Sequence, residues 1–169
     1  MPAMNASDRL SPHLTFGEAV TTEHVEFLEL QQNPPADILA NLARFAAGLF
    51  ESSRAIIGRP WHVNSMYRCP ELNAALPGRS KTSQHMRGLA GDLLPIRLPL
   101  MDAFEKLRKA VLDGSLPADQ LIWEYGRWIH LGDSIEGSAG PRRQVMMIFE
   151  PGEYLPFDRA DPRLPPSSG

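Results

Sequence analysis

The chain has 169 residues, which is the usual size of one domain and too short for two ordinary domains. Hydrophobic residues make up 43% and charged residues 22% of it, a balance typical of a folded globular domain. The net charge of −3 argues against a nucleic-acid-binding protein, because such proteins usually carry an excess of basic residues. The single cysteine, Cys69, excludes an intramolecular disulfide bond.

The sequence shows no segment for membrane insertion or export. No stretch approaches the roughly 18 consecutive apolar residues that a membrane-spanning helix needs. The first residues, MPAMNASDRLSPHLTF, have neither a basic start nor an apolar run, so no signal peptide is visible. We therefore expect a protein that is made in the cytoplasm and does not insert into a membrane.

The first half of the chain is predicted to be mainly helical. Apolar residues at helical spacing predict a helix over about 35–58, which begins after two prolines and ends at a glycine. Alternating residues predict a strand over 61–65. A short helix is expected over 70–76, followed by a loop over 77–83 that is rich in Gly, Ser, Lys and Thr.

The second half is predicted to be mainly strands. One helix with an apolar face is expected over about 99–113. Strand patterns cover 89–96, 119–124, 127–131 and 144–149. Helices that precede strands predict an α+β fold, in which the helices pack on an antiparallel sheet.

The domain boundary is expected near the C-terminal end of the chain. Residues 1–160 are predicted to form a single domain. Residues 161–169 contain three prolines and two serines, and we expect them to form a flexible tail.

The segment S-Q-H-M-R-G-L-A-G-D contains the first candidate site residues, His85 and Asp92. The small residues Gly88 and Gly91 between them would let the chain turn from a loop into a strand. An unpaired buried carboxylate is costly, so Asp92 in an apolar strand needs a partner, and a metal ion is one such partner. The alternative is that Asp92 bonds backbone amides or an arginine, and that His85 is a surface loop residue.

The segment W-E-Y-G-R-W-I-H contains the second pair, Glu124 and His130. Glu124 ends one predicted strand, and His130 lies inside the next one. A tight hairpin with its turn at Tyr125 and Gly126 would place both side chains on one face of the sheet. The alternative is a sheet histidine bonded to a backbone carbonyl, with Glu124 as a solvated turn residue.

Together, His85, Asp92 and His130 offer two imidazoles and one carboxylate. Catalytic zinc typically takes three protein ligands of these types and keeps one position for water. Glu124 would then supply a carboxylate that is free to act as a base. The spacing alone leaves this zinc site and the two structural alternatives open.

The pattern H-x-x-G-x-A-x-D that ends at Asp92, followed by the W-x-H that ends at His130, resembles the zinc D-Ala-D-Ala peptidases. The surrounding motifs strengthen the resemblance. The stretch S-M-Y-R-C-P-E-L-N is similar to the family's S-G-Y-R-S-P-E-L-N, and S-K-T-S-Q-H-M-R-G is similar to its S-K-T-S-Q-H-x-x-G. The match is clearest with the compact branch of the family that is common in phage genomes, and covers roughly residues 10–149.

The resemblance implies N-terminal helices packed on a central antiparallel sheet that holds zinc, as in the hedgehog signalling domain. It implies zinc as the cofactor, with His85, Asp92 and His130 as its ligands. Many relatives carry the catalytic acid three residues before the last histidine, where this chain has Arg127. The E-x-G-R-W-x-H variant of this branch assigns that role to Glu124.

The resemblance also implies residues that contact the substrate. Arg68 matches the arginine that faces the scissile carbonyl in relatives, and Ser83 matches a serine that lines the substrate site. We expect Tyr67, beside Arg68 in its motif, and Trp128, beside the last zinc segment, to contact the substrate as well.

These expectations describe an enzyme that hydrolyses an amide bond in peptidoglycan stem peptides, as a D,D-carboxypeptidase or an endopeptidase. Glu124 would accept a proton from a zinc-activated water, and Arg68 would stabilise the developing oxyanion. One alternative is a zinc-stabilised module that binds peptidoglycan or a phage structural protein without cleavage. Another is a zinc-free scaffold.

The implied substrate, peptidoglycan, lies outside the cytoplasmic membrane, whereas the sequence shows no export signal. A phage product that is carried by a virion, or released when the host lyses, would reconcile the two. Phage structural proteins are therefore candidate partners, whereas nucleic acid is not expected to be one.

Overall fold

A computed structural model describes residues 4–77, 80–166 and 168 of the chain. It shows a mixed α+β fold around a six-stranded sheet, which confirms the predicted fold class. The strand order across the sheet is β3-β4-β6-β5-β7-β8. These strands are β3 Trp61–Ser65, β4 Ala90–Pro95, β5 Gln120–Glu124, β6 Trp128–Gly132, β7 Gln144–Ile148 and β8 Tyr154–Pro156.

One pair of neighbouring strands departs from the predicted antiparallel sheet, because β5 and β7 are parallel. The chain leaves β6, passes the start of β5 and enters β7, which lies on the side of β5 away from β6. Asp119 fixes this crossover, since its backbone carbonyl accepts from the amide of Gln144 and its carboxylate accepts from the amide of Arg142. The sequence pattern predicts strands but not the side on which a strand joins the sheet.

The long predicted helix is present as three consecutive segments, which are α3 Ala36–Phe45, a π-helical segment η2 Ala46–Phe50 and α4 Glu51–Ile57. It ends at Gly58, which has a left-handed conformation with φ of 67°. The helices predicted after it are also present, as α5 Pro70–Ala75 and α6 Leu100–Asp113.

Several short elements were not predicted from the sequence. Besides β8, they are β1 Arg9–Ser11, β2 Leu14–Thr15, α1 Phe16–Ala19, η1 Val25–Phe27, α2 Leu28–Gln32 and η3 Gln84–Arg87. They are too short for a hydrophobic period to stand out. None of the helices within the described ranges has the length and apolarity that crossing a bilayer would require.

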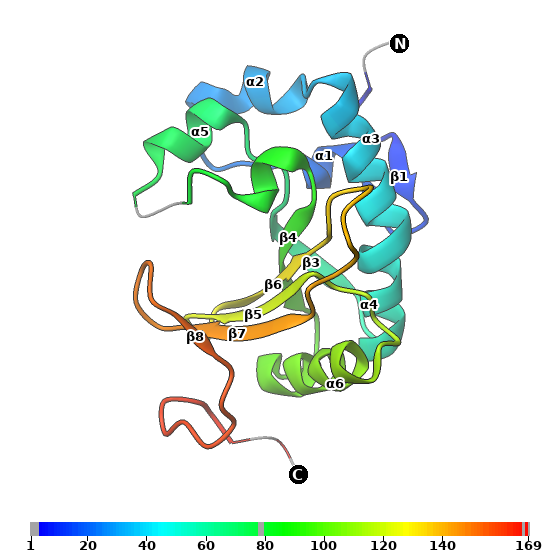
Figure 1. Ribbon diagram of the computed structural model, residues 1–169. Coiled ribbons are helices and arrows are strands. Elements are labelled where there is room, and N and C mark those ends of the chain that lie inside the picture. The colour runs from blue at the N-terminus through cyan, green and yellow to red at the C-terminus, as the bar shows by residue number, and fades with distance from the viewer. Residues whose placement is uncertain (1–3, 78–79, 167, 169) are drawn as a thin grey trace.

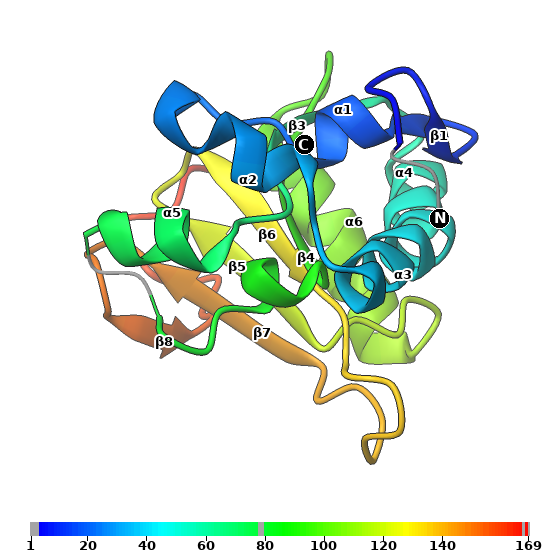
Figure 2. The ribbon, with the colours of Figure 1, turned by 90° about the horizontal axis from the view of Figure 1, so that it is seen from above.

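The helices lie on both sides of the sheet (Figure 1). Helix α6 packs against β4, β5 and β6 on one side. On the other side, α2 and α5 lie over the strands, while α3 and α4 stand beside them (Figure 2). The side chain of Leu164 is 8% exposed and belongs to the core, so the described part of the predicted tail contacts the domain.

Successive side chains of a strand point to opposite faces of the sheet, and this alternation separates the core from the site. Leu121 and Trp123 of β5 and Ile129 of β6 are buried in the hydrophobic core. Their neighbours along the strands, Glu124 and His130, line a cavity on the opposite face. The fold therefore presents polar residues on one face and apolar residues on the other.

Candidate metal centre

Three elements bring His85, Asp92 and His130 together. Asp92 of β4 lies directly opposite His130 of β6 in the antiparallel register. His85 comes from η3, which is capped by Ser83, whose hydroxyl accepts from the amide of His85. The next glycine, Gly88, ends η3 in a left-handed conformation and turns the chain toward β4.

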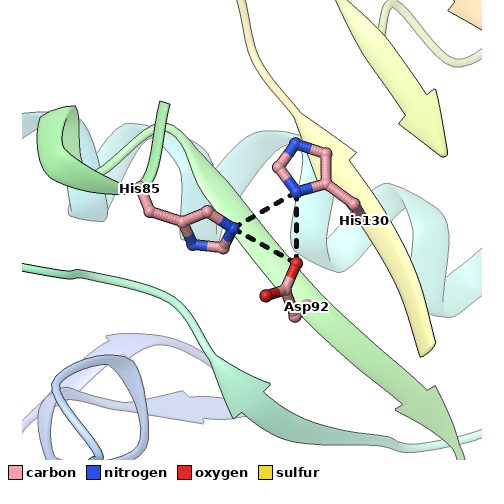
Figure 3. A group of neighbouring side chains, drawn as sticks. All are labelled: His85, Asp92 and His130. Carbon is pink, nitrogen blue, oxygen red and sulfur yellow. Dashed lines mark hydrogen bonds and ion pairs between the residues drawn. The ribbon is translucent and has the colours of Figure 1, made fainter. Parts of the chain in front are cut away.

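The three side chains point toward one another (Figure 3). His85 Nε2 lies 3.2 Å from Asp92 Oδ1 and 3.2 Å from His130 Nδ1, and His130 Nδ1 lies 3.1 Å from Asp92 Oδ1. Ligand atoms at zinc–nitrogen and zinc–oxygen bond lengths from a tetrahedral ion lie about 3.3 Å apart. The spacing of these three atoms therefore fits one zinc ion.

Each imidazole has an outer nitrogen, the one that faces away from the other two candidate ligands. The hydrogen-bond partners of these outer nitrogens indicate which ring atoms hold protons. His85 Nδ1 lies 2.7 Å from the carbonyl oxygen of Met66, which can only accept a hydrogen bond. His130 Nε2 lies 3.4 Å from Oε1 of Gln84, which also accepts. With protons assigned to these outer nitrogens, neutral imidazoles direct two lone pairs at the Asp92 carboxylate. Three facing acceptors need a cation between them, so these residues fit a metal.

Burial disfavours the charged form of each group, and neighbouring charges modify the result. Burial lowers the pKa of His85, and Arg68 acts in the same direction against the opposing effect of Asp92. Burial would raise the pKa of Asp92, but a proton on the facing nitrogens of His85 and His130 outweighs burial and holds the pKa of the carboxyl well below its usual range. Burial would lower the pKa of His130, but Asp92 and Glu124 outweigh it and raise that pKa. Asp92 thus supplies the negative charge of the site.

Glu124 lies beside the three candidate ligands, as the hairpin pattern predicts. Its Oε1 is 3.8 Å from His130 Nδ1, and its Oε2 accepts a hydrogen bond of 2.9 Å from Trp128 Nε1. The turn after β5 contains Tyr125 and Gly126, both with positive φ, which confirms the predicted turn. Glu124 is 6% exposed, and its bond to Trp128 holds the carboxylate beside the candidate metal site.

Arg68 lies beside Oδ2 of Asp92, the carboxylate oxygen that does not face the two imidazoles. Its Nη2 is 3.8 Å from Asp92 Oδ2, and its Nη1 donates to Asn73 Oδ1 at 3.3 Å. The backbone amide of Arg68 donates to the carbonyl of His85, which links the segment after β3 to η3. The guanidinium is therefore a fixed, buried positive charge next to the candidate ligands.

A cavity of about 370 Å³ opens onto the three candidate ligands. Arg68, Ser83 and Glu124 line it, as expected for residues that meet a substrate. Tyr67 and Trp128 are not among its lining residues. Tyr67 is 3% exposed and belongs to the hydrophobic core. The role of Trp128 that the structure shows is its hydrogen bond to Glu124.

The comparison with protein families agrees with this geometry. A profile described as Peptidase M15 matches residues 18–132, about two thirds of the chain. The chain belongs to the M15 family of zinc D-Ala-D-Ala peptidases. No curated protein matches the chain.

Membership of the M15 family supports a metal-dependent peptidase with a peptidoglycan-type substrate. The matched region contains all three residues of the candidate metal site as well as Arg68 and Glu124. Arg127, which stands where many relatives carry the catalytic acid, is exposed and is not among the lining residues of the cavity. The carboxylate beside the site is that of Glu124.

Several residues around the candidate site were missed by the sequence analysis. Gln84, Arg142 and Tyr154 line the cavity, and Arg142 and Tyr154 lie beyond the region matched by the family. Asp119 lies behind them and bonds both Gln84 and Arg142. Gln84 stood in a motif that the sequence analysis quoted, but the motif does not show that its side chain contacts Asp119, Asp133 and His130.

Proposed function

We propose that this protein is a zinc peptidase that hydrolyses an amide bond in peptidoglycan stem peptides, with His85, Asp92 and His130 as the zinc ligands. One observation supports the proposal most strongly. Three acceptor atoms spaced for one ion converge in an open cavity, with a buried carboxylate beside them that is not needed as a ligand. Catalytic zinc sites have this composition, with three protein ligands and one position left for water.

Zinc bound at this site would act as a Lewis acid and lower the pKa of a water molecule toward neutrality. Glu124 is the group placed to accept a proton from that water, since its Oε1 faces the ligands. Trp128 Nε1 donates to the other carboxylate oxygen and so orients the carboxyl group of Glu124. The same carboxyl group would then donate the proton to the leaving amine.

Arg68 would stabilise the charge that develops on the scissile carbonyl oxygen. Arg68 is 4% exposed, and Asn73 and Asp92 hold its guanidinium in place. A positive group that is already fixed needs little reorganisation during the reaction, and is therefore an effective electrostatic catalyst. We assign Arg68 this role and Ser83, at the cavity wall, a role in substrate binding.

Mass spectrometry of muropeptides tests the proposal. Purified murein is incubated with the zinc-loaded protein and, in parallel, with the Glu124→Gln variant. We expect new amine ends with the wild-type protein and a loss of about 10²–10⁴-fold in rate with the variant. Loss of terminal alanine would identify a carboxypeptidase, and cleaved cross-links or stems would identify an endopeptidase.

The variant must keep its zinc for the result to bear on Glu124, so zinc content is measured for both proteins. Wild-type protein with one bound zinc per chain and no new muropeptide ends would contradict the proposal. That result would favour the alternative of a zinc-stabilised binding module. Full activity of Glu124→Gln would contradict its role as the base.

A further inference from the structure

Gln84 lies between the candidate ligand His130 and the crossover into β7. Its Nε2 donates to Asp119 Oδ2 at 2.9 Å and to the carbonyl oxygen of Asp133 at 3.0 Å. Both partners are acceptors, so the nitrogen of the amide must face them. The amide oxygen consequently faces His130 Nε2, at a distance of 3.4 Å.

Asp119, the anchor of Gln84, is itself fixed. It is 4% exposed, and Arg142 donates to its two carboxylate oxygens from Nε and Nη2 and to one of them from the backbone amide. A carboxylate held by a guanidinium in this way is a rigid, charged acceptor. The amide of Gln84 therefore has little freedom to rotate away from His130.

Gly132 provides the space that Gln84 occupies. It follows His130 by two residues on β6, so its missing side chain would point to the same face of the sheet. A Cβ atom at this position would overlap the side-chain amide of Gln84. The amide can therefore lie directly on the strand that carries the ligand.

We propose that Gln84 is a positioning residue that holds the His130 ring with Nε2–H outward and Nδ1 toward the metal. This inference rests on the proposed metal site. Gln84 is not placed to bind the metal itself, because its amide oxygen faces Nε2 of His130. The rigid connection from Arg142 through Asp119 to Gln84 fixes the ring plane before the metal binds.

Zinc affinity of the Gln84→Met variant tests this role, with Gln120→Met as the matched control. Gln120 lines the same cavity, but its amide bonds Gln144 and not the ligands. Loss of an outer partner of a ligating histidine typically weakens metal binding 10–100-fold. We expect a loss of about this size in Gln84→Met, measured by competition with a chelator, and none in Gln120→Met.

Nuclear magnetic resonance of the zinc-loaded proteins measures exchange of the Nε2–H proton of His130 with solvent. A purely structural role of Gln84 would not change this exchange. We expect the Nε2–H proton of His130 to be protected from exchange with solvent in the wild type and in Gln120→Met. In Gln84→Met the same proton should exchange rapidly. Wild-type zinc affinity and a protected proton in Gln84→Met would overturn the proposal, as would equal losses in the two variants.

Gln84→Asn provides a second test should Gln84→Met fail to fold. Its amide has the same chemistry but is one methylene shorter, so it cannot reach Asp119 and His130 together. We expect faster exchange of the Nε2–H proton and weaker zinc binding, and wild-type values would overturn the proposal. Neither measurement depends on hydrolysis. If the proposed zinc site itself is wrong, the wild-type protein will not bind zinc, which distinguishes that outcome from a failure of the role of Gln84.

Discussion

The two faces of the central sheet are built by the same strands and have opposite properties. Toward α6, Leu121, Trp123 and Ile129 are fully buried in the apolar core. Toward the cavity, the residues one position along the same strands include Glu124 and His130, which are buried but polar. One face is closed by packing, and the other stays open around ionisable groups.

This difference indicates how the fold can tolerate a charged cluster. Buried ionisable groups are costly unless they are paired or bind a metal. Apolar packing on the α6 face supplies the stability that the polar face does not. We therefore expect that changes on the α6 face alter the free energy of unfolding, whereas changes on the cavity face alter metal binding.

The largest effect is expected from Phe104→Ala on the α6 face. Phe104 is fully buried, 5.7 Å from the Trp123 ring and 4.7 Å from the Phe157 ring between centroids. Such truncations typically cost about 3–5 kcal/mol of unfolding free energy. Denaturant unfolding measures this, with Leu112→Ala on the exposed side of the same helix as the control. An equally large loss in Leu112→Ala would contradict the assignment of this face to the core.

The second effect is expected from Asp92→Asn on the cavity face. The amide keeps the shape of the side chain but removes the negative charge from the candidate ligand set. We expect zinc affinity to fall by more than about 100-fold, beyond what loss of an outer partner causes. Chelator competition measures it, and the exposed Asp37→Asn on α3 is the control. Unchanged zinc binding in Asp92→Asn would exclude this residue as a ligand.

A third, smaller effect concerns the connection between η3 and α3. Gly88 has φ of 65°, and a Cβ there would lie 2.9 Å from the carbonyl oxygen of Ile38. Gly58 has a similar φ of 67° with open space around it, so Gly58→Ala measures the backbone cost alone, about 1–2 kcal/mol. We expect Gly88→Ala to cost more than this and to weaken zinc binding by shifting His85.

Thermal unfolding of both glycine variants measures the loss of stability, and competition with a chelator measures the loss of zinc affinity. Equal stability losses, with zinc affinity unchanged in both variants, would show that the approach of η3 to α3 does not position His85.

The smallest effect concerns the assignment of Tyr67 to the core. Burial raises the pKa of Tyr67 to about 12, above the value near 10 expected in the unfolded chain. A raised folded-state pKa gives stability that is present below about pH 10 and is lost as the pH rises toward about 12. Relative to Tyr67→Phe, we expect the wild type to lose about 1 kcal/mol per pH unit in this window.

Unfolding of both proteins at increasing alkaline pH measures that difference. Substrate kinetics of Tyr67→Phe should match the wild type, because the side chain does not line the cavity. A changed KM with no difference in alkaline stability would instead place Tyr67 against the substrate.

The residues of the candidate metal site could be predicted from sequence because they lie in short, local patterns. The hairpin pattern placed Glu124 and His130 on one face, and the structure shows this arrangement. The motif around His85 and Asp92 named two residues whose side chains the structure brings together. The convergence of Asp92 with His130 depends on β4 pairing with β6, a pairing that the sequence analysis did not predict.

The residues that support the site could not be predicted, because their contacts cross the sheet. Asp119 and Arg142 are 23 positions apart, and Gln84 and Asp119 are 35 apart. Asp119 meets Arg142 because β7 joins the sheet parallel to β5, a pairing that carries no signal in local hydrophobic periodicity. Tyr67 was assigned to the substrate through its neighbour Arg68, and that motif carries no signal for the burial of its side chain in the core.

An anomalous difference map at the zinc absorption edge, from crystals of the zinc-loaded protein, tests the central claim most directly. We expect one peak, bonded to His85 Nε2, Asp92 Oδ1 and His130 Nδ1, with a remaining position open to the cavity. Gln84 Oε1 should lie against the outer nitrogen of His130. A map with no peak at these atoms, or with its zinc peak elsewhere, would contradict the assignment of a metal centre to the polar face of the sheet.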